Sequence, residues 1–383
     1  MDNKKTKNLF LKFCGIFVCL GLLMLFLSGC TNNIPDYSNY VNSSYTPTDA
    51  IVFEDEFGET AIKLSENRDI KVLQLTDIHI GNGPLTEKKD KKAIEAVCKV
   101  IEHAKPDLIV LSGDLVFPVT IMTGTNDNLS ALKVLANVIE KYKTPWTICM
   151  GNHDAEDFAK YSKSEICSYL ESSELKYCIF NRGPSNLDGM GNHLINVYNA
   201  NNSYNSCLFF FDNGMYNGGS QLSGYQELSD NQVNWYSSKI NQFSQAKGQT
   251  ITSYVYYHVP GKEYEEAWNL YKQNSPKVEL IYGYANEKNE KLSCSSEFGT
   301  FFETAVSLGS TKAIFCGHDH LNDFSLLYKG IRLTYGKSID YTAYQFQGIT
   351  SKTEQRGGTL LTIKTSSQGE KFEITPIKLT DIQ

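Results

Sequence analysis

The feature that most constrains this chain of 383 residues is a series of apolar segments that end in metal-binding side chains. Four of these segments lead into Asp77-Ile78-His79, Gly113-Asp114, Gly151-Asn152-His153-Asp154 and Gly317-His318-Asp319-His320, and a fifth leads into His258. Open α/β sheets place their ligand sites just beyond the carboxyl ends of the strands. If the apolar segments are strands of such sheets, the polar side chains that follow them meet at one place.

The pattern around the first three segments predicts a parallel sheet. The predicted strands are 70–76, 107–111 and 146–150, and the predicted helices are 91–103, 130–142 and 156–170. Strands that alternate with helices in this way are typical of βαβ units. Asp77, Asp114 and Asn152 follow one another in steps of 37 and 38 residues, each close to one βαβ unit, so we expect them to emerge side by side.

The rest of the chain adds further strands. They are predicted at 194–198, 207–211, 251–257, 312–316, 324–328, 331–335, 359–364 and 371–377, and the last four lie close enough in sequence to predict an antiparallel run. The pattern as a whole predicts an α/β fold with two sheets. Glycines at 113, 151 and 317 are expected to let the backbone turn sharply and come close to an ion.

The side chains at the segment ends suit particular metals. Mixed carboxylate, imidazole and amide ligands suit Mn, Fe or Zn better than a soft thiolate site would. There are enough of them for two ions. Two ions about 3.5–4 Å apart can clamp the attacking and leaving oxygens of an in-line displacement at phosphorus and lower the pKa of a bridging water.

The motifs DxH, GD, GNHD, a single His after a strand, and GHDH, in that order, resemble the calcineurin-like metallophosphoesterase superfamily over roughly residues 70 to 345. The resemblance implies a sandwich of two mixed β-sheets flanked by helices, and two divalent or trivalent metal ions. Asp77, His79 and His320 would hold the first ion, Asn152, His258 and His318 the second, and Asp114 would bridge both.

The resemblance also implies roles in catalysis for two residues of the GNHD motif. His153 would lie near the ester and protonate or stabilise the leaving oxygen. Asp154 would orient the imidazole of His153, or it would be a solvated acid. His193, in a predicted loop, is a candidate for the border of the substrate pocket.

Two differences from the motifs of well-known branches indicate which branch of the superfamily the sequence resembles. Leu115 follows Gly113-Asp114, so the Asp-Arg pair that continues this motif in protein Ser/Thr phosphatases is missing. Phe117 stands where purple acid phosphatases have a tyrosine ligand, so no phenolate-bound iron is expected. The sequence is most similar to proteins that are related to purple acid phosphatases but lack that tyrosine.

The N-terminal residues predict an exported lipoprotein. A lysine-rich start and a short apolar stretch from Phe13 to Leu27 are followed by Leu27-Ser28-Gly29-Cys30, which resembles a bacterial lipobox. We therefore expect a signal peptide over 1–29, a lipidated Cys30, a flexible tether over 30–50 and the catalytic domain over 51–383 at the outer face of the cell membrane. The alternative is an uncleaved anchor, for which about fifteen apolar residues are few.

Charge and cysteine content exclude some classes of function. The net charge of −7 offers no basic surface for nucleic acid, so we expect no nucleic-acid partner. Seven cysteines remain after Cys30, with no regular spacing, which is a poor disulfide framework. A bridge between Cys167 and Cys178 is a possibility that no pattern supports.

The expected function is hydrolysis of phosphate esters, with a phosphorylated small molecule or a phosphoprotein as substrate. Phosphomonoesters are favoured by analogy with the branch. A phosphodiesterase or nucleotide hydrolase would use the same motifs and stays open. So does a non-catalytic surface lipoprotein that binds a phosphorylated ligand, although every ligand position is filled. A solute-binding lipoprotein would need two lobes, whereas these ligands converge from positions 77 to 320.

Overall fold

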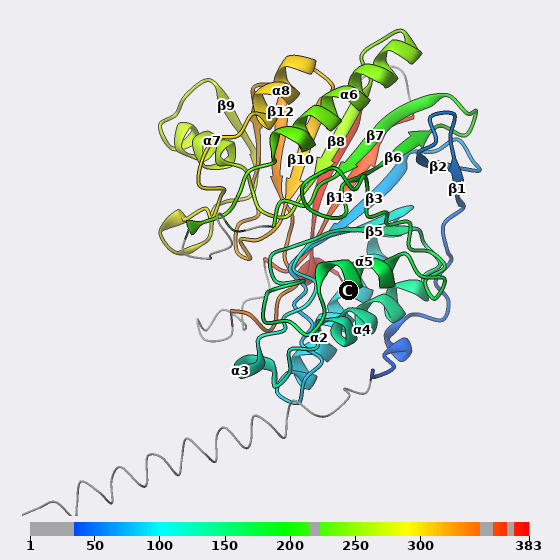
Figure 1. Cartoon of the computed structure of the whole chain (residues 1–383), viewed down its shortest axis with the longest axis vertical. Coiled ribbons are helices and arrows are strands. Elements are labelled where there is room, and N and C mark those ends of the chain that lie inside the picture. Colours follow the sequence, from blue (N-terminus) through cyan, green and yellow to red (C-terminus); the bar gives the residue numbers. More distant parts are fainter. Residues whose placement is uncertain (1–33, 215, 217–222, 345–354, 366–370, 383) are drawn as a thin grey trace, which may run out of the picture.

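Two β-sheets face each other and carry helices on their outer sides in the computed structural model of the chain (Figure 1). The structure describes residues 34–214, 216, 223–344, 355–365 and 371–382. Within those ranges no helix combines the length and the apolar character that a membrane span requires. The predicted α/β fold with two mixed sheets is confirmed.

The smaller sheet has the order β14-β13-β3-β4-β5. Its strands are β3 (Ile70–Leu75), β4 (Leu108–Ser112), β5 (Trp146–Cys149), β13 (Gly357–Ile363) and β14 (Phe372–Lys378). The outer face packs against α2 (Glu87–Ala104), α4 (Asn128–Glu140) and α5 (Lys163–Leu170). Strands β3, β4 and β5 are parallel neighbours, as the spacing of the motifs predicts.

The larger sheet has the order β1-β2-β6-β7-β8-β10-β12-β11-β9. Its strands are β1 (Ala50–Glu54), β2 (Thr60–Leu64), β6 (His193–Tyr198), β7 (Tyr204–Phe210), β8 (Thr252–Tyr256), β9 (Val278–Tyr282), β10 (Thr311–Cys316), β11 (Ser325–Tyr328) and β12 (Ile331–Tyr335). Helices α6 (Asp230–Lys247), α7 (Lys262–Lys272) and α8 (Phe301–Leu308) cover its outer face. Shorter pieces are α3 (Thr120–Thr123), η1 (Ser38–Tyr40), η4 (Lys288–Glu290) and η7 (Leu379–Asp381).

The apolar runs of the sequence follow from burial on both faces of each sheet. Along β10, Ala313 and Phe315 point into the core between the sheets, whereas Ile314 and Cys316 point into the core under the helices. Successive side chains of a strand point to opposite faces, so a strand covered on both faces is apolar throughout. This burial makes the strand ends rigid positions for the side chains that follow.

Two predictions about the elements are wrong. The last four strands do not form one antiparallel run, because β11 and β12 pair in the larger sheet and β13 and β14 pair in the smaller one. The helix predicted over 156–170 begins only at Lys163, where Ser162 and Glu165 form a reciprocal capping box that satisfies the first free N–H groups. Local patterns do not reveal which sheet a hairpin joins.

The predicted tether is packed against the domain over its described part, residues 34–50. Tyr37 is buried against the core under α2, and β1 begins at Ala50. Arg68 binds both Asp49 and the buried Asp107, and Thr48 donates a hydrogen bond to Asp107 at 2.5 Å. Residues 34–50 are therefore packed against the domain in spite of their polar composition. The predicted signal peptide over 1–29 and Cys30 lie outside the described residues.

The described cysteines are all free thiols, including Cys167 and Cys178. Cys149 and Cys316 are fully buried in strands of the two sheets, where they pack as small apolar side chains. The structure thus provides no disulfide framework within these residues.

We expect Asp107→Ala to lower the free energy of unfolding by about 1–3 kcal/mol, because it leaves Arg68 and the Lys71 N–H without a buried acceptor. Urea unfolding of the full chain measures the change. The control is Glu95→Ala, which removes an exposed ion pair with Lys99 and should cost less than about 0.5 kcal/mol. Equal effects in the two variants would contradict the assigned role of Asp107.

Candidate metal centre

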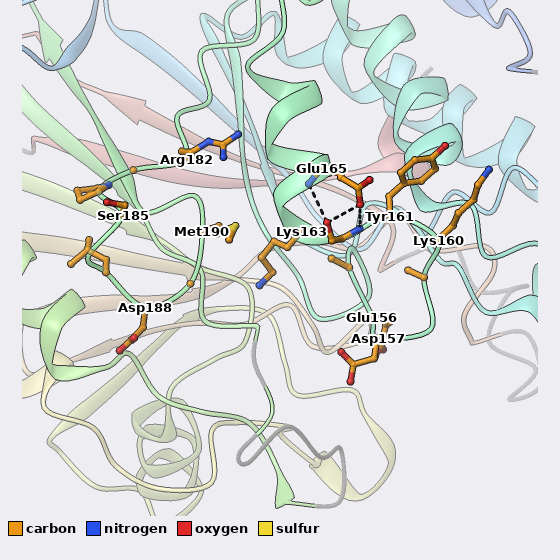
Figure 2. A pocket seen from close by; sticks show the side chains of 17 residues that line it. Glu156, Asp157, Lys160, Tyr161, Lys163, Glu165, Arg182, Ser185, Asp188 and Met190 are labelled. Carbon is orange, nitrogen blue, oxygen red and sulfur yellow. Dashed lines mark hydrogen bonds between the residues drawn. The ribbon is translucent and has the colours of Figure 1, made fainter.

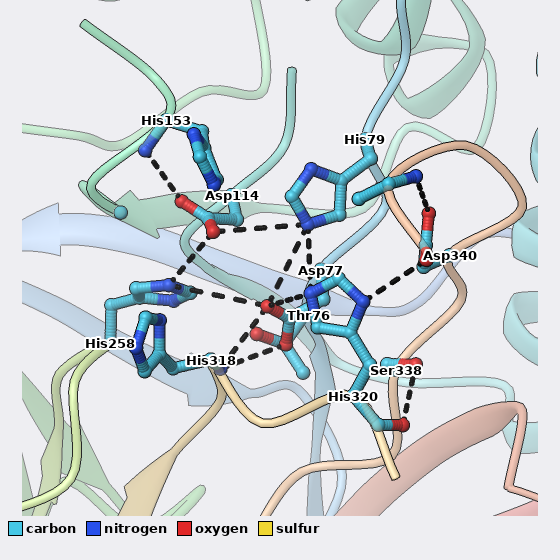
Figure 3. Close-up of polar contacts among 12 residues, drawn as sticks. Thr76, Asp77, His79, Asp114, His153, His258, His318, His320, Ser338 and Asp340 are labelled. Carbon is cyan, nitrogen blue, oxygen red and sulfur yellow. Dashed lines mark hydrogen bonds and ion pairs between the residues drawn. The ribbon is translucent and has the colours of Figure 1, made fainter. Parts of the chain in front are cut away.

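The carboxyl ends of strands from both sheets meet at one place (Figure 3). Asp77 and His79 follow β3, and Asp114 follows β4. Asn152 follows β5 in the same sheet, whereas His258 follows β8, and His318 and His320 follow β10, in the other sheet. The backbone N–H of His318 donates a hydrogen bond to Asp77 Oδ1 at 3.1 Å, and this bond joins the two sheets here. All seven predicted ligand residues thus lie at the meeting of the sheets.

Asp77, His79, Asp114 and His320 form the first cluster, with one potential ligand atom from each residue within 4.8 Å of the others. The Nε2 atoms of His79 and His320 are 3.0 Å apart. Asp77 Oδ1 lies 3.5 Å from Nε2 of His320, and Asp114 Oδ2 lies 3.8 Å from Nε2 of His79. Three residues of this cluster are those predicted for the first ion, and the fourth is the predicted bridge.

Asp114, His258 and His318 form the second cluster, again within 4.8 Å. Asp114 Oδ2 is 3.2 Å from Nε2 of His258, so this carboxylate faces both clusters. Asn152 is buried, and the backbone N–H of the next residue, His153, donates to Asp114 Oδ1. The Oδ1 atom of Asn152 accepts no hydrogen bond from any described residue, which agrees with the part expected of it as a ligand.

Several buried polar atoms at this place have no hydrogen-bond partner. Such atoms test whether the residues fit bound cations. They include Nδ1 of His318 and Oδ1 of Asn152, for which no described residue provides a hydrogen bond. A buried polar atom without a partner costs about 1–3 kcal/mol. Two imidazole nitrogens 3.0 Å apart would also need one proton between them or a shared cation. The set therefore fits metal ions.

The electrostatics of the buried groups agree with that fit. Burial disfavours a charged imidazole at His258, but the adjacent Asp114 carboxylate outweighs this effect and raises the pKa of His258 to about 10. Burial, reinforced by the charge of His320, lowers the pKa of His79 to about 3. Burial raises the pKa of Asp77. Without another positive charge nearby, the carboxylates favour protonation of the neighbouring histidines. A bound cation would supply that positive charge instead.

Strained backbone marks the same residues. Asp77, His79, Asp114 and His318 have φ angles of 51°, 53°, 52° and 77°, in the left-handed region that residues with a side chain seldom adopt. Such conformations cost about 1–3 kcal/mol each and cluster at functional sites. The turns after β3, β4 and β10 therefore aim these side chains at the cost of backbone strain.

Two glycines of the motifs permit the close packing. Gly113 has a φ of 94°, and a Cβ there would lie 2.5 Å from Nδ1 of His258. A Cβ on Gly151 would lie 2.2 Å from the backbone nitrogen of Asp114. A larger residue at either position would displace a predicted ligand. This confirms the close approach expected for the glycines.

Two histidines are held by partners behind them. His320 Nδ1 is 3.0 Å from Asp340 Oδ2, and His258 Nδ1 donates to the backbone oxygen of Ser112 at 2.9 Å. Such contacts direct the remaining nitrogen, Nε2, at the site. Asp340 is in turn fixed by backbone N–H groups of Thr342 and Ala343. Asp340 was not among the predicted residues; it lies five residues after the end of β12, and extending the strand-end rule that far would have found it.

Asp154 does not orient His153, which corrects the sequence-based expectation. Its carboxylate is buried and accepts N–H groups from Asp114, Leu115, Val116 and Gly151 at 2.7–3.2 Å. It therefore fixes the backbone turn that carries Asp114. The carboxylate next to the His153 imidazole belongs to Glu156, whose Oε1 is 2.9 Å from Nδ1. Glu156 lay inside the helix predicted over 156–170, where it had no expected role.

His193 also differs from its prediction. It lies in β6 and is buried, with Nε2 2.7 Å from Thr147 Oγ1 and Nδ1 2.8 Å from the Gly191 oxygen. Phe210 stacks on its ring with centroids 4.7 Å apart. His193 is thus a core residue between two strands and does not border the site.

A groove of about 860 Å³ lies beside the centre (Figure 2). It is bounded by residues 155–163 and 182–190, and Lys163, Arg182 and Asp188 are among its walls. Glu156 and Asp157 lie together at one end of it. Because Glu156 also contacts His153, the groove begins next to that histidine.

Comparison of this chain with known proteins identifies its family. The family model described as calcineurin-like phosphoesterase matches residues 70–322, and this family uses a dinuclear metal centre. A relative named "Probable inactive purple acid phosphatase 29", from Arabidopsis thaliana, is 26% identical over 95% of this chain and 92% of its own. "Phosphatase DCR2" from Saccharomyces cerevisiae is 27% identical over 76% of this chain and 50% of its own.

Among solved structures, a dimetal phosphatase from Danio rerio is similar, with a TM-score of 0.53 over 82% of this chain and 97% of its own. At 10% identity this likeness shows the fold alone. The family match covers most of the described chain and all seven predicted ligand residues. The chain therefore belongs to the calcineurin-like phosphoesterase family.

Proposed function

We propose that this chain hydrolyses phosphomonoesters at a dinuclear metal centre, on a phosphorylated small molecule or a phosphoprotein. The observation that carries the proposal is that Asp114 faces both clusters at once, with His153 beside them. A buried carboxylate shared by two groups of ligands is what two adjacent ions require. The family membership supports hydrolysis of a phosphate ester as the reaction.

Each residue has a defined part in this proposal. Asp77, His79 and His320 would hold one ion, Asn152, His258 and His318 the other, and Asp114 would bridge them. Two bound ions would supply a water of lowered pKa and positive charge beside the phosphate oxygens. We propose Mn, Fe or Zn from the mixed ligand types.

The surroundings of His153 suit a proton donor to the leaving oxygen. Its ring makes edge contacts with His79 and Phe117, at centroid distances of 5.5 and 5.1 Å, and the side chain is 26% exposed. Burial opposes the charged imidazole, but nearby Asp114 and Glu156 raise the pKa of His153. A protonated imidazole that reaches the open side of the site can give its proton to the departing oxygen.

Phe117 affects which kind of metal centre we propose. It packs against His79, and we propose that it takes the position in which purple acid phosphatases have a tyrosine ligand. A phenyl ring has no oxygen to coordinate iron, so we propose a centre without a phenolate and without the purple colour.

Two alternatives follow from specific observations. The names of the Arabidopsis relatives mark those proteins as probably inactive, which favours a surface protein that binds a phosphorylated ligand without turnover. A phosphodiesterase or nucleotide hydrolase would use the same ligands. Assays of the full chain loaded with Mn, Zn, Fe or Mg, on mono- and diester substrates, separate the three. Binding without turnover under all conditions would contradict the proposed enzyme.

We expect Asp114→Asn to lower the bound metal from about two ions per chain to one or fewer and turnover by about 10³-fold, because the shared carboxylate is lost. Metal content is measured by elemental analysis and turnover by phosphate release. Asp319→Asn is the matched control, because Asp319 belongs to the same set of motifs but turns away to accept Tyr335 OH and Ser293 N–H. Two ions and undiminished rates in Asp114→Asn would contradict the proposed bridge.

We expect His153→Ala to slow hydrolysis of esters with a poor leaving group, such as phenyl phosphate, by about 10²–10⁴-fold. Esters of 2,4-dinitrophenol should be much less affected, because that leaving oxygen departs without a proton. His103→Ala, at an exposed position at the end of α2, is the control. Equal losses on both substrates would argue against proton donation by His153.

We also propose that the chain is exported and held at the outer face of the cell membrane by a lipid on Cys30, with no nucleic acid among its partners. The lipobox-like Leu27-Ser28-Gly29-Cys30 supports this proposal. We expect Cys30→Ala to leave the precursor unprocessed or to release the protein from membranes, as judged by fractionation and mass spectrometry. Cys19→Ala, within the apolar stretch, should behave like the wild type. Normal anchoring of Cys30→Ala would contradict the lipid.

A further inference from the structure

We propose that Glu156 is the positioning residue of His153 and holds the imidazole with Nε2 directed at the leaving oxygen. This inference rests on the proposed function for its chemical meaning. The contact that motivates it joins Glu156 Oε1 and His153 Nδ1 over 2.9 Å. Glu156 lies outside the five motifs that end the apolar segments of the sequence.

Glu156 is placed for this part by its burial and its neighbours. Only 9% of the residue is exposed, although it lies at the edge of the groove. The Tyr216 hydroxyl lies 3.4 Å from Glu156 Oε1 and 3.3 Å from the amide nitrogen of Asn152. Tyr216 thus connects the carboxylate to the side chain of a proposed ligand.

The other carboxylate of this region is excluded as the partner of His153. Asp154 accepts four backbone N–H groups, from residues 114, 115, 116 and 151, which account for both of its oxygens. Although Asp154 is next to His153 in sequence, its carboxylate therefore does not contact the imidazole. Glu156, three residues after His153, is the acid that reaches Nδ1.

The imidazole is confined on its remaining sides. The backbone N–H of His153 donates to Asp114 Oδ1 at 2.8 Å, and the rings of Phe117 and His79 meet the imidazole edge to face. No described residue hydrogen-bonds to Nε2. The ion-pair contact at Nδ1 is close but is not an aligned hydrogen bond, and catalytic contacts of this kind tighten when substrate binds. With Nδ1 committed to Glu156, Nε2 is the nitrogen left for the substrate.

The chemistry that follows is a displacement at phosphorus in which His153 gives one proton to the leaving oxygen. The oxygen of water forms a bond to phosphorus, and the ester P–O bond breaks with its electron pair going to the leaving oxygen. That oxygen takes the proton from Nε2 of His153, while Nδ1–H stays with Glu156. The proton lost by water passes to solvent, and His153 regains one from solvent. A carboxylate behind an imidazole selects the tautomer and stabilises the charged form in this way.

A double-mutant cycle on the full chain tests the inference. We expect Glu156→Gln to lower kcat for phenyl phosphate by about 10–100-fold with little change in KM, and to have a much smaller effect on 2,4-dinitrophenyl phosphate. In a His153→Ala background, Glu156→Gln should cause no further loss, because its effect passes through the imidazole. Losses that multiply in the double variant would overturn the proposal.

Controls separate positioning from a general effect on the centre. Asp157→Asn changes the adjacent, exposed acid at the same end of the groove and should leave both rates unchanged. Glu156→Gln should keep the wild-type metal content. A loss of bound metal in Glu156→Gln would show that the residue acts on the ligands through Tyr216 and Asn152, and would overturn the assigned role.

A second readout does not depend on turnover. In the full chain labelled with ¹⁵N-histidine, the signals of His153 are those absent from His153→Ala. At a pH where His153 is neutral, we expect them to show the proton on Nδ1 in the wild type and a changed tautomer balance in Glu156→Gln. An unchanged spectrum would overturn the inference. A chain with the expected spectrum but no turnover on any ester would instead contradict the proposed function and leave the positioning role intact.

Discussion

The structure depends on bringing buried carboxylates together with histidines at the meeting of two sheets. Asp77 and Asp114 have essentially no contact with solvent, and removing each charge from water costs several kcal/mol unless opposite charge or hydrogen bonds replace the water. The four residues with left-handed backbone, Asp77, His79, Asp114 and His318, add strain at the same place. Only a fold that is rigid on both sides of the site can hold such an arrangement, and the doubly covered strands β3, β4, β8 and β10 supply that rigidity.

The predicted ligands are divided between the two sheets, so the candidate site exists only where both sheets meet. β3, β4 and β5 bring Asp77, Asp114 and Asn152, and the larger sheet brings three histidines. The sheets are joined at the site itself by bonds such as His318 N–H to Asp77 and His258 Nδ1 to the Ser112 oxygen. Packing between the sheets, through side chains such as Val72 and Phe315, therefore also sets the distance between the two halves of each cluster.

The sequence was informative where a residue's role follows from its position at a strand end, and uninformative where it depends on how loops fold. The parallel order of β3, β4 and β5 and the convergence of the predicted ligands follow from the strand-end rule. The assignment of β13 and β14 to the smaller sheet does not, because pairing between distant strands has no local signal. The family resemblance implied a contact between Asp154 and His153, or a solvated acid, but the fold of the turn directs the Asp154 carboxylate at backbone N–H groups instead.

Asp154 and Glu156 together show how one short loop serves both sides of the site. Asp154 draws in the N–H groups around Asp114, so the shared carboxylate sits on a turn that is fixed from behind. Glu156 lies two residues later, where the chain has left that turn and reached the groove. The same loop thus holds the proposed bridging side chain in place and provides the contact to His153, which links the geometry of the proposed metal ligands to that of the proposed proton donor. A preorganised site needs this coupling, because a hydroxide and an acid act on one ester only if their separation is fixed.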